Sequence, residues 1–275
     1  MTVQFYPNGI GGTAPGDSLD LAKPLQMTGN VWYVSSLIGT DAASPAGQNR
    51  EKPLATIAQA ITNSADDDII VFLAGHTQTL VAPAVLNKRL TLIGEGTTSG
   101  KPAVSFLINN PNSTVIVMSS VGCEIRNIYF PPSVQANTVD RVAITGTDCV
   151  VRGCYFECGA TDNAAALAVA ASRARVDTST FISIATATGA QPKMAITVPA
   201  TVTAVGFTME SVVVSAGTVG FSNYAAIDMT PAVSVTQVKW QGLSLLLGAD
   251  VAMGPGATGR VNVQLATGGS RVSWS

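Results

Sequence analysis

Carboxylates are the candidate catalytic residues of this sequence, because two acids held at a fixed separation can cleave a glycosidic bond. From residue 95 onward the acids are Glu95, Glu124, Asp140, Asp148, Glu157, Asp162, Asp177, Glu210, Asp228 and Asp250. When the chain is aligned on its internal repeat, these acids rarely fall at equivalent positions in consecutive copies. Glu124 and Asp177 come nearest to facing one sheet, with Val150 between them. We therefore predict no catalytic residues, although an active site shared between subunits would escape this test.

Metal ligands and a histidine base are the next candidates. A calcium site wants a local acidic cluster, and the only acidic run is Asp66-Asp67-Asp68, directly before the apolar segment "IIVFL". We predict that this run solvates a turn. His76 is the sole histidine, and its setting "AGHTQ" predicts a turn or coil edge, where a Ser-His-Asp triad would need a serine and an acid nearby. The sequence therefore predicts no metal and no cofactor.

The four cysteines lack the paired short spacings and the histidine support of a zinc site. Cys154 and Cys158 form a Cys-x₃-Cys, whereas Cys123 and Cys149 lie in separate copies of the repeat. By phase the four point inward, where free cysteine behaves as a small hydrophobe. We predict a reduced core ladder, with a disulfide between Cys123 and Cys149 as the alternative.

Charge and composition argue against several classes of partner. The chain has 15 basic and 17 acidic residues, so it lacks the basic footprint of a nucleic-acid binder. The glycine-rich pieces "GIGG", "GEGTTSG" and "GPGATG" lack the strand-to-helix context and the Lys-Ser/Thr ending of a phosphate loop. No run approaches about 18 apolar residues, and residues 1–30 contain no basic segment followed by an apolar one. We expect neither export nor membrane insertion.

A motif of eight residues recurs along most of the chain, at intervals of 25 to 33 residues. "CEIRNIYF" at 123–130 returns as "CVVRGCYF" at 149–156. Taking the closing aromatic of each copy as a marker gives Phe130, Phe156, Phe181, Phe207 and Trp240, with steps of 26, 25, 26 and 33 residues. A truncated last copy, "GSRVSW", ends at Trp274, and "KRLTLIGE" at 88–95 is an early one. A period of 20 to 50 residues predicts stacked coils that bury a shared core.

Each copy also follows a second short β-branched segment, so each period holds two or three strands and no convincing helix. These segments are "STVIVM" (113–118), "RVAIT" (141–145), "AALAV" (165–169), "MAITV" (194–198) and "AAIDM" (225–229). Within the first octet, Cys123 and Ile125 share one phase, the pair at 126–127 breaks it, and Ile128 and Phe130 resume it. We predict a strand, a sharp turn and a strand, with Ile125 over Val151, Ile128 over Cys154 and Phe130 over Phe156 in the next coil.

These ladders resemble right-handed parallel β-helices of the pectin-lyase-like kind. The opening "WYVSSLIGTDAASPAGQNREKPLATIAQAITNSADDDIIVFLAGHTQ" at 32–78 is similar to the start of many such proteins, with a Gly-x-Asp loop (Gly39, Asp41) and a short helix after Pro53. The resemblance implies an all-β fold, a right-handed parallel β-helix (solenoid) at 31–275, with a capping helix at about 54–64. Residues 1–30 are then an extended N-terminal arm.

The resemblance extends to function through weakly charged members that carry an N-terminal arm. These look most like bacteriophage structural proteins, either trimeric capsid decoration proteins or tailspikes. It implies a virion protein on the capsid exterior, made in the host cytoplasm, which binds the major capsid protein or another virion protein and cements the shell without catalysis. The alternative is a tailspike or carbohydrate-active β-helix that binds or cleaves host surface polysaccharide.

Self-association is expected because only 12% of the residues are charged, about half the usual share. The segment "NAAALAVAAS" at 163–172 has tiny side chains on both faces, which let another surface approach closely. We expect a homo-oligomer, a trimer above all, with this segment at its interface. A loop packed tightly over the same sheet is the alternative.

Overall fold

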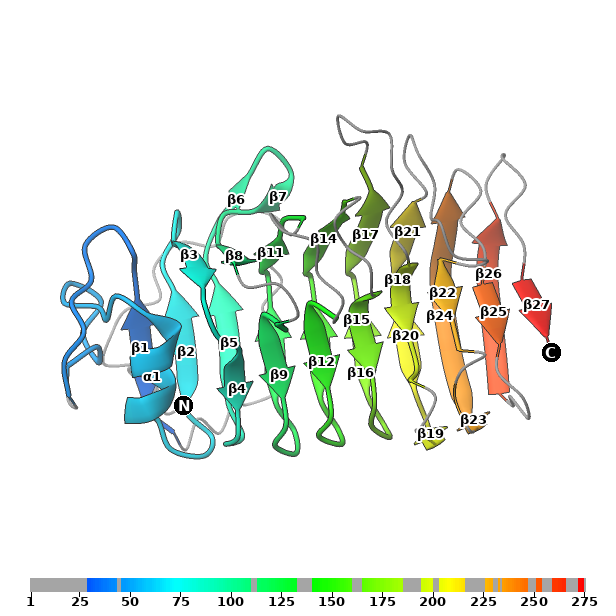
Figure 1. Ribbon diagram of the computed structural model, residues 1–275, viewed down its shortest axis with the longest axis horizontal. Coiled ribbons are helices and arrows are strands. Elements are labelled where there is room, and N and C mark those ends of the chain that lie inside the picture. The colour runs from blue at the N-terminus through cyan, green and yellow to red at the C-terminus, as the bar shows by residue number, and fades with distance from the viewer. Residues whose placement is uncertain are drawn as a thin grey trace, which may run out of the picture.

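A computed structural model of the chain describes residues 29–43, 46–109, 113–132, 140–159, 165–184, 194–199, 203–215, 226–229, 232, 234–246, 251–253, 259–265 and 272–274. These residues form 27 β-strands and one short α-helix. Every strand pairing among them is parallel except the one within a small hairpin. Figure 1 shows the strands stacked side by side along one axis, from the N-terminal to the C-terminal end. The described residues thus have the all-β, parallel β-helix architecture that the sequence predicts.

The largest sheet has 15 strands in two runs that meet in one long strand, β24. The first run is β1 (Val31–Val34), β2 (Ile69–Phe72), β5 (Thr91–Gly94), β10 (Glu124–Arg126), β13 (Val150–Arg152), β16 (Arg175–Asp177), β20 (Thr208–Glu210) and β24 (Val238–Leu246), and β26 (Gly259–Leu265) pairs with β24. The second run is β3 (Thr77–Leu80), β8 (Ser105–Ile108), β11 (Tyr129–Phe130), β14 (Tyr155–Cys158), β17 (Thr180–Ser183) and β21 (Val213–Ser215).

A second sheet of eight strands contains the β-branched segments that precede the octets. Its strands are β4 (Ala84–Leu86), β9 (Ile116–Met118), β12 (Val142–Ile144), β15 (Ala165–Val169), β18 (Met194–Thr197), β22 (Ile227–Asp228), β25 (Val251–Met253) and β27 (Val272–Trp274). Two small pairs complete the fold: β6 (Thr97–Thr98) with β7 (Lys101–Pro102), and β19 (Thr203–Val205) with β23 (Ser234–Thr236). Each coil therefore passes from the eight-stranded sheet into the first run and then the second.

The core is the inward ladder. Ile125 pairs with Val151 and Phe130 with Phe156, and all four side chains are fully buried. The rings of Phe130, Phe156 and Phe181 stack face to face, with centroids 4.7 and 4.5 Å apart and interplanar angles of 11° and 3°. This spacing is the distance between neighbouring strands, so the stack follows from placing phenylalanine at one inward position in three successive coils. The predicted ladder is confirmed.

The sharp turn inside each octet is a single residue in the left-handed region. Asn127 has a φ of 52°, and its side-chain amide donates to the carbonyl of Gly94 at 2.7 Å. Gly153, Thr178 and Ser211 take positive φ at the corresponding point of the next three coils. Because this corner reverses the inward and outward phase, it creates the break that the sequence predicts at 126–127.

Three of the aromatic markers lie in other rows than the sequence predicts. Phe207 precedes β20 and therefore corresponds to Cys123, while Val214 is the partner of Phe181. Trp240 pairs with Met209, in the row of Ile125. Phe207 and Trp240 are nonetheless buried and pack edge to face at 6.2 Å. The prediction failed because the coils lengthen after Phe181, so an aromatic residue at another inward row mimicked the expected step.

The third misassigned marker, Trp274, belongs to the other sheet. It pairs with Met253 through β25 and β27, so "GSRVSW" is a strand of the eight-stranded sheet rather than a truncated octet. By contrast, "KRLTLIGE" contains β5, which pairs with β10, so an early copy is present. It begins two residues later than predicted, because Leu92 and not Leu90 lies opposite Ile125.

The N-terminal end is closed by helix α1 (Ile57–Asn63) and the loop before it. The Asp41 carboxylate accepts hydrogen bonds from the backbone N–H groups of Ala55 and Thr56 at 2.8 and 3.0 Å, and from the Thr56 hydroxyl at 2.7 Å. Thr56 is the N-cap, and Ile57 and Ala60 are buried against the first coil. Loop residues also pair with β1: the N–H of Ser35 donates to the carbonyl of Leu54 at 2.8 Å. The predicted capping helix is confirmed, with tighter bounds.

The predicted arm, residues 1–30, lies outside the described residues except for its last two positions. The small-residue segment at 163–172 is described from residue 165 onward. All five residues of β15 are buried within one chain: Ala166 belongs to the core, and Ala168, which lies in the outward row of Ala143 and Val117, is only 2% exposed. Because both faces of this strand are already covered, the structure favours the alternative of close packing within the chain over an interface there.

Candidate functional site

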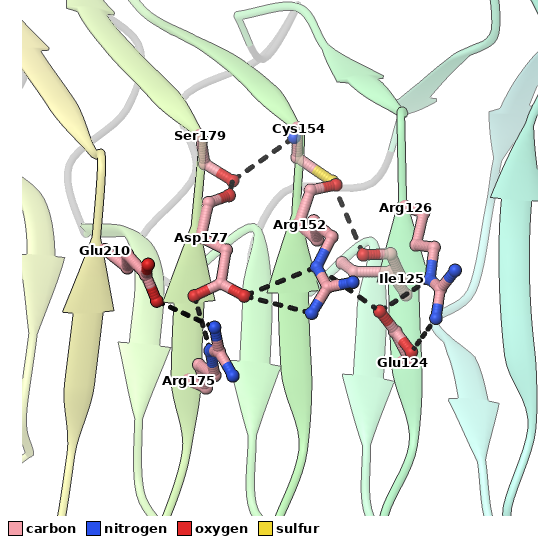
Figure 2. A network of polar contacts seen from close by, with 9 residues as sticks. All are labelled: Glu124, Ile125, Arg126, Arg152, Cys154, Arg175, Asp177, Ser179 and Glu210. Carbon is pink, nitrogen blue, oxygen red and sulfur yellow. Dashed lines mark hydrogen bonds and ion pairs between the residues drawn. The ribbon is translucent and has the colours of Figure 1, made fainter. Parts of the chain in front are cut away.

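The outer face of the first run has a row of charged side chains on neighbouring coils. β10 and β13 each bury a central residue and turn the two flanking side chains outward. In-register pairing aligns Glu124, Val150, Arg175, Thr208 and Lys239 in one row, and Arg126, Arg152, Asp177, Glu210 and Gln241 in the other. Figure 2 shows Glu124, Arg126, Arg152, Arg175, Asp177 and Glu210 in contact, and these six residues are called the charged ladder.

The charged ladder alternates in sign. Arg126 donates two hydrogen bonds of 2.6 Å to Glu124. Arg152 donates to Asp177 at 3.1 and 3.3 Å. Arg175 bridges two acids, with Nε 2.7 Å from Asp177 and a terminal nitrogen 2.8 Å from Glu210. Three cations and three anions thus neutralise one another within the chain.

Burial differs strongly along the charged ladder. The Asp177 side chain is only 5% exposed, whereas that of Glu210 is 53% exposed. The hydrogen bond with Asp177 is the main reason that the pKa of Arg175 is raised. Beside Glu210 lies a depression of about 110 Å³ lined by Arg175, Thr208, Met209, Glu210, Lys239 and Gln241. This volume is below the roughly 300 to 1,000 Å³ of most ligand sites.

The ladder corrects the prediction about acids. Glu124 and Asp177 lie in different rows, because the row of Glu124 continues through Val150 to Arg175. Asp177 instead pairs directly with Glu210, so two acids do occupy equivalent positions in consecutive coils. The sequence alone does not predict this pair, because aligning Phe207 with Phe181 moves Glu210 out of register, whereas the true partner of Phe181 is Val214.

The chemistry of the pair is limited by Arg175. A glycosidase needs its two carboxyl groups to face the scissile bond, with a water or a sugar between them. Here a guanidinium group bridges Asp177 and Glu210, and a second one, from Arg152, binds Asp177. The arrangement joins three coils by charge-assisted hydrogen bonds, which are stronger than neutral ones.

The acidic run before β2 has a structural role. Asp68 is 1% exposed, and its carboxylate accepts from the indole N–H of Trp32 at 2.7 Å and from the backbone N–H of Asn30 at 2.6 Å. Asp66 accepts from the backbone N–H of Arg89 at 2.7 Å, and Asp67 forms an ion pair with the same arginine. No group of three or more potential metal ligands occurs among the described residues.

His76 lies in a turn, as the sequence predicts, but it is fully buried. Its Nδ1 accepts a hydrogen bond from the backbone N–H of Ser36 at 2.9 Å, and its ring contacts Phe72 and Phe106. Burial lowers the pKa of His76 to about 4. The histidine is therefore a neutral core residue that ties the first loop to the rod.

All four cysteines are free and buried, as the reduced ladder predicts. Cys123 donates to the carbonyl of Lys88 at 3.3 Å, and Cys149 donates to that of Ser120 at 3.2 Å. A hydrogen bond with Cys123, together with burial, raises the pKa of Cys149. Burial raises the pKa of Cys154 to about 12. Cys149 and Cys154 are therefore poor nucleophiles, whereas the hydrogen bond with Cys149 lowers the pKa of Cys123 to about 7. All four thiols are buried and pack as core side chains.

A second outer cluster escaped sequence reasoning. It consists of Lys101, Tyr129, Tyr155 and Glu157, and is called the tyrosine cluster. Tyr129 and Tyr155 pair in register on β11 and β14, and their rings meet edge to face at 6.0 Å. Lys101 and the Tyr129 hydroxyl both bind the Glu157 carboxylate. Burial and the bond to Glu157 raise the pKa of Tyr129. The signal was present, because the octets at 123–130 and 149–156 each have a tyrosine just before the closing phenylalanine.

The chain matches no protein-family model and no curated protein. No helix among the described residues is long and apolar enough to cross a membrane. The fold itself defines the class: the described residues form a parallel β-helix, and the six charges of the charged ladder on its outer face bind one another. Its right-handedness stays a prediction.

Proposed function

We propose that this protein is a structural component of a bacteriophage particle, a homotrimeric β-helix that decorates the capsid exterior and cements the shell. The observation that carries the proposal is the charged ladder, in which the outward acids and arginines of four successive coils bind one another. A rod whose strands pair within the chain and whose ladder charges bind one another needs no ligand for stability, and it offers a rigid body for assembly.

Exposed valines support self-association. Val85 is 42% exposed on β4, the edge strand of the eight-stranded sheet, and Val81 and Val121 in nearby loops are 73% and 56% exposed. The outward row of this sheet continues from Val85 to Val117 and Ala143, so its first three strands present no charge. Because burying this row removes apolar area from water, a second copy of the chain is the occupant that we propose.

The copy number per particle tests this role. Quantitative mass spectrometry of purified phage particles would measure this protein against the major capsid protein, and light scattering of the isolated protein would give its oligomeric state. Hundreds of copies in fixed ratio to the shell, together with a trimer, are expected. A few to a few tens of copies would place the protein on the tail, and its absence from particles would overturn the proposal.

A second candidate function is polysaccharide binding or cleavage, and the register pairing of Asp177 with Glu210 favours it. The test compares Asp177→Asn and Glu210→Gln with wild type for release of reducing ends from the surface polysaccharide of the host. Asp148→Asn is the matched control, because Asp148 forms an exposed ion pair with Arg173 away from the charged ladder. Activity in wild type and the control that is lost in both ladder variants would establish catalysis. Absence of cleavage by wild type would leave the ladder structural.

A further inference from the structure

The tyrosine cluster joins three side chains of the rod, those of Tyr129, Tyr155 and Glu157, to one lysine on a hairpin, Lys101. Lys101 lies on β7, which pairs with β6 in an antiparallel hairpin. The hairpin turns through Ser99 and Gly100, with φ values of 52° and 79°, as in the two-residue turns that suit hairpins. Figure 1 shows β6 and β7 projecting beyond the stacked strands, between β5 and β8. Lys101 reaches from this hairpin to Glu157 of β14.

The contacts around the Lys101 amine are those that recognise an ammonium ion. Its nitrogen lies 5.2 Å from the ring centroid of Tyr129 and 5.3 Å from that of Tyr155, within the distance for attraction to an aromatic face. The same nitrogen forms an ion pair with one oxygen of Glu157, while the Tyr129 hydroxyl donates to the other. Two rings and a carboxylate thus converge on one cation.

Tyr129, Tyr155 and Glu157 are held in position by the rod and not by the hairpin. Tyr129 and Tyr155 belong to paired strands of the rod, with the stacked Phe130 and Phe156 next to them in sequence. The main-chain carbonyl of Glu157 accepts a hydrogen bond of 2.6 Å from the buried Arg141. Arg141 also donates to the carbonyls of Phe130 and Pro131, so it links the ends of β11 and β14 through their main chains.

The exposed fractions of the side chains also separate Lys101 of the hairpin from Glu157 of the rod. The Lys101 side chain is 36% exposed, while that of Glu157 is 12% exposed. The lysine therefore covers a carboxylate that is otherwise held within the rod. Moving the hairpin away would uncover Glu157 and the two rings without breaking any pairing within the long sheet, because β6 and β7 pair only with each other.

We infer that Tyr129, Tyr155 and Glu157 form a binding site for a primary ammonium group from outside the chain, and that Lys101 occupies this site in the free protein. A primary ammonium fits better than a quaternary one, because the carboxylate needs an N–H donor. A lysine side chain of another protein and an amino sugar both carry this group. This site goes beyond the proposed decoration role, since neither the ladder nor the valines contribute to it.

An external amine must compete with the Lys101 side chain for the site, and this competition determines the expected change in affinity. A tethered group acts at an effective concentration in the millimolar range, so it competes directly with a weakly binding external amine. Removing it is expected to increase the affinity for such an amine about ten-fold. The site itself should remain, because the variant alters only the hairpin.

The experiment is an NMR titration of the full-length protein with n-butylammonium, an analogue of the lysine side chain. Ring currents shift ligand protons upfield when they lie over the tyrosine faces, so the shift reports the site as well as the affinity. Wild type is compared with Lys101→Ala, and with Lys239→Ala as a matched control on the same sheet, since Lys239 is an exposed lysine of β24 outside the tyrosine cluster. Lys101→Met is a second variant that keeps most of the side chain.

About ten-fold tighter binding and upfield shifts in both Lys101 variants, unchanged binding in Lys239→Ala, and loss of the gain in Lys101→Ala/Glu157→Gln are expected. A parallel titration with glucosamine distinguishes the sources: a stronger response than that of butylammonium indicates an amino sugar, and a weaker one a lysine side chain. If the Lys101 variants bind no better than wild type, or if the gain does not depend on Glu157, Lys101 is only a hairpin anchor.

Discussion

Replacing Phe156 by alanine tests the central argument about the core. Phe156 is fully buried, and its ring stacks between those of Phe130 and Phe181 at 4.7 and 4.5 Å. Truncation removes both contacts and leaves a cavity between coils that cannot close without distorting the strand spacing. The expected loss is about 3 to 5 kcal/mol of unfolding free energy, at the upper end of large-to-small core substitutions. That is a large part of the roughly 5 to 15 kcal/mol that stabilises a domain.

Tyr155→Ala is the matched control, because Tyr155 precedes Phe156 on the same strand and points outward. Its removal loses one ring contact and one cation–π contact, worth about 1 to 2 kcal/mol together. Urea denaturation followed by circular dichroism would give both unfolding free energies. A smaller loss for Phe156→Ala than for Tyr155→Ala would refute the inward assignment of the octet and, with it, the ladder.

Three further substitutions probe separate features. His76→Gln should flatten the pH dependence of stability. The pKa of His76 is lowered to about 4 in the folded chain, whereas the unfolded chain binds a proton near pH 6.5, so the unfolding free energy of wild type falls by up to about 3 kcal/mol between about pH 6.5 and pH 4. Urea denaturation at several pH values would show this loss in wild type and its absence in the variant. Arg141→Met leaves three carbonyls without their buried donor and should cost at least about 3 kcal/mol in the same assay, and a neutral effect would contradict its role in linking the ends of β11 and β14. Asp41→Ala removes three hydrogen bonds at the start of α1 and should cost about 1 to 2 kcal/mol, with faster hydrogen exchange confined to residues 55–63.

The sequence predicts the inward ladder well because burial imposes strict alternation on short strands. Phase alone predicts that Ile125, Ile128, Phe130 and the four cysteines point inward, and all of them are buried. Register between distant coils was harder, since aromatic residues occur at more than one inward row. The left-handed corner is a better marker: Thr178 and Ser211 each follow an outward acid, and aligning them would have paired Asp177 with Glu210.

The tyrosine cluster could not be predicted in full because it joins residues far apart in sequence. Tyr129 and Tyr155 follow from the repeat, but Lys101 reaches them through a hairpin that lies outside the repeat. The path of such an insertion depends on packing against coils that come later in the chain. The bridging role of Arg175 was hidden for a similar reason, because side-chain direction along an outer row is not encoded by phase.

The closed N-terminal end gives the rod a direction. β1 is an edge strand, and an unpaired edge is a template on which another chain could add its own coil. Here residues 46–54 occupy that edge: Leu54 accepts from Ser35 and donates to Tyr33, and Gly47 accepts from Tyr33. α1, held by Asp41, packs over the first coil. Head-to-tail growth of one rod onto the next through this end is therefore blocked, which leaves assembly to the sides of the rod.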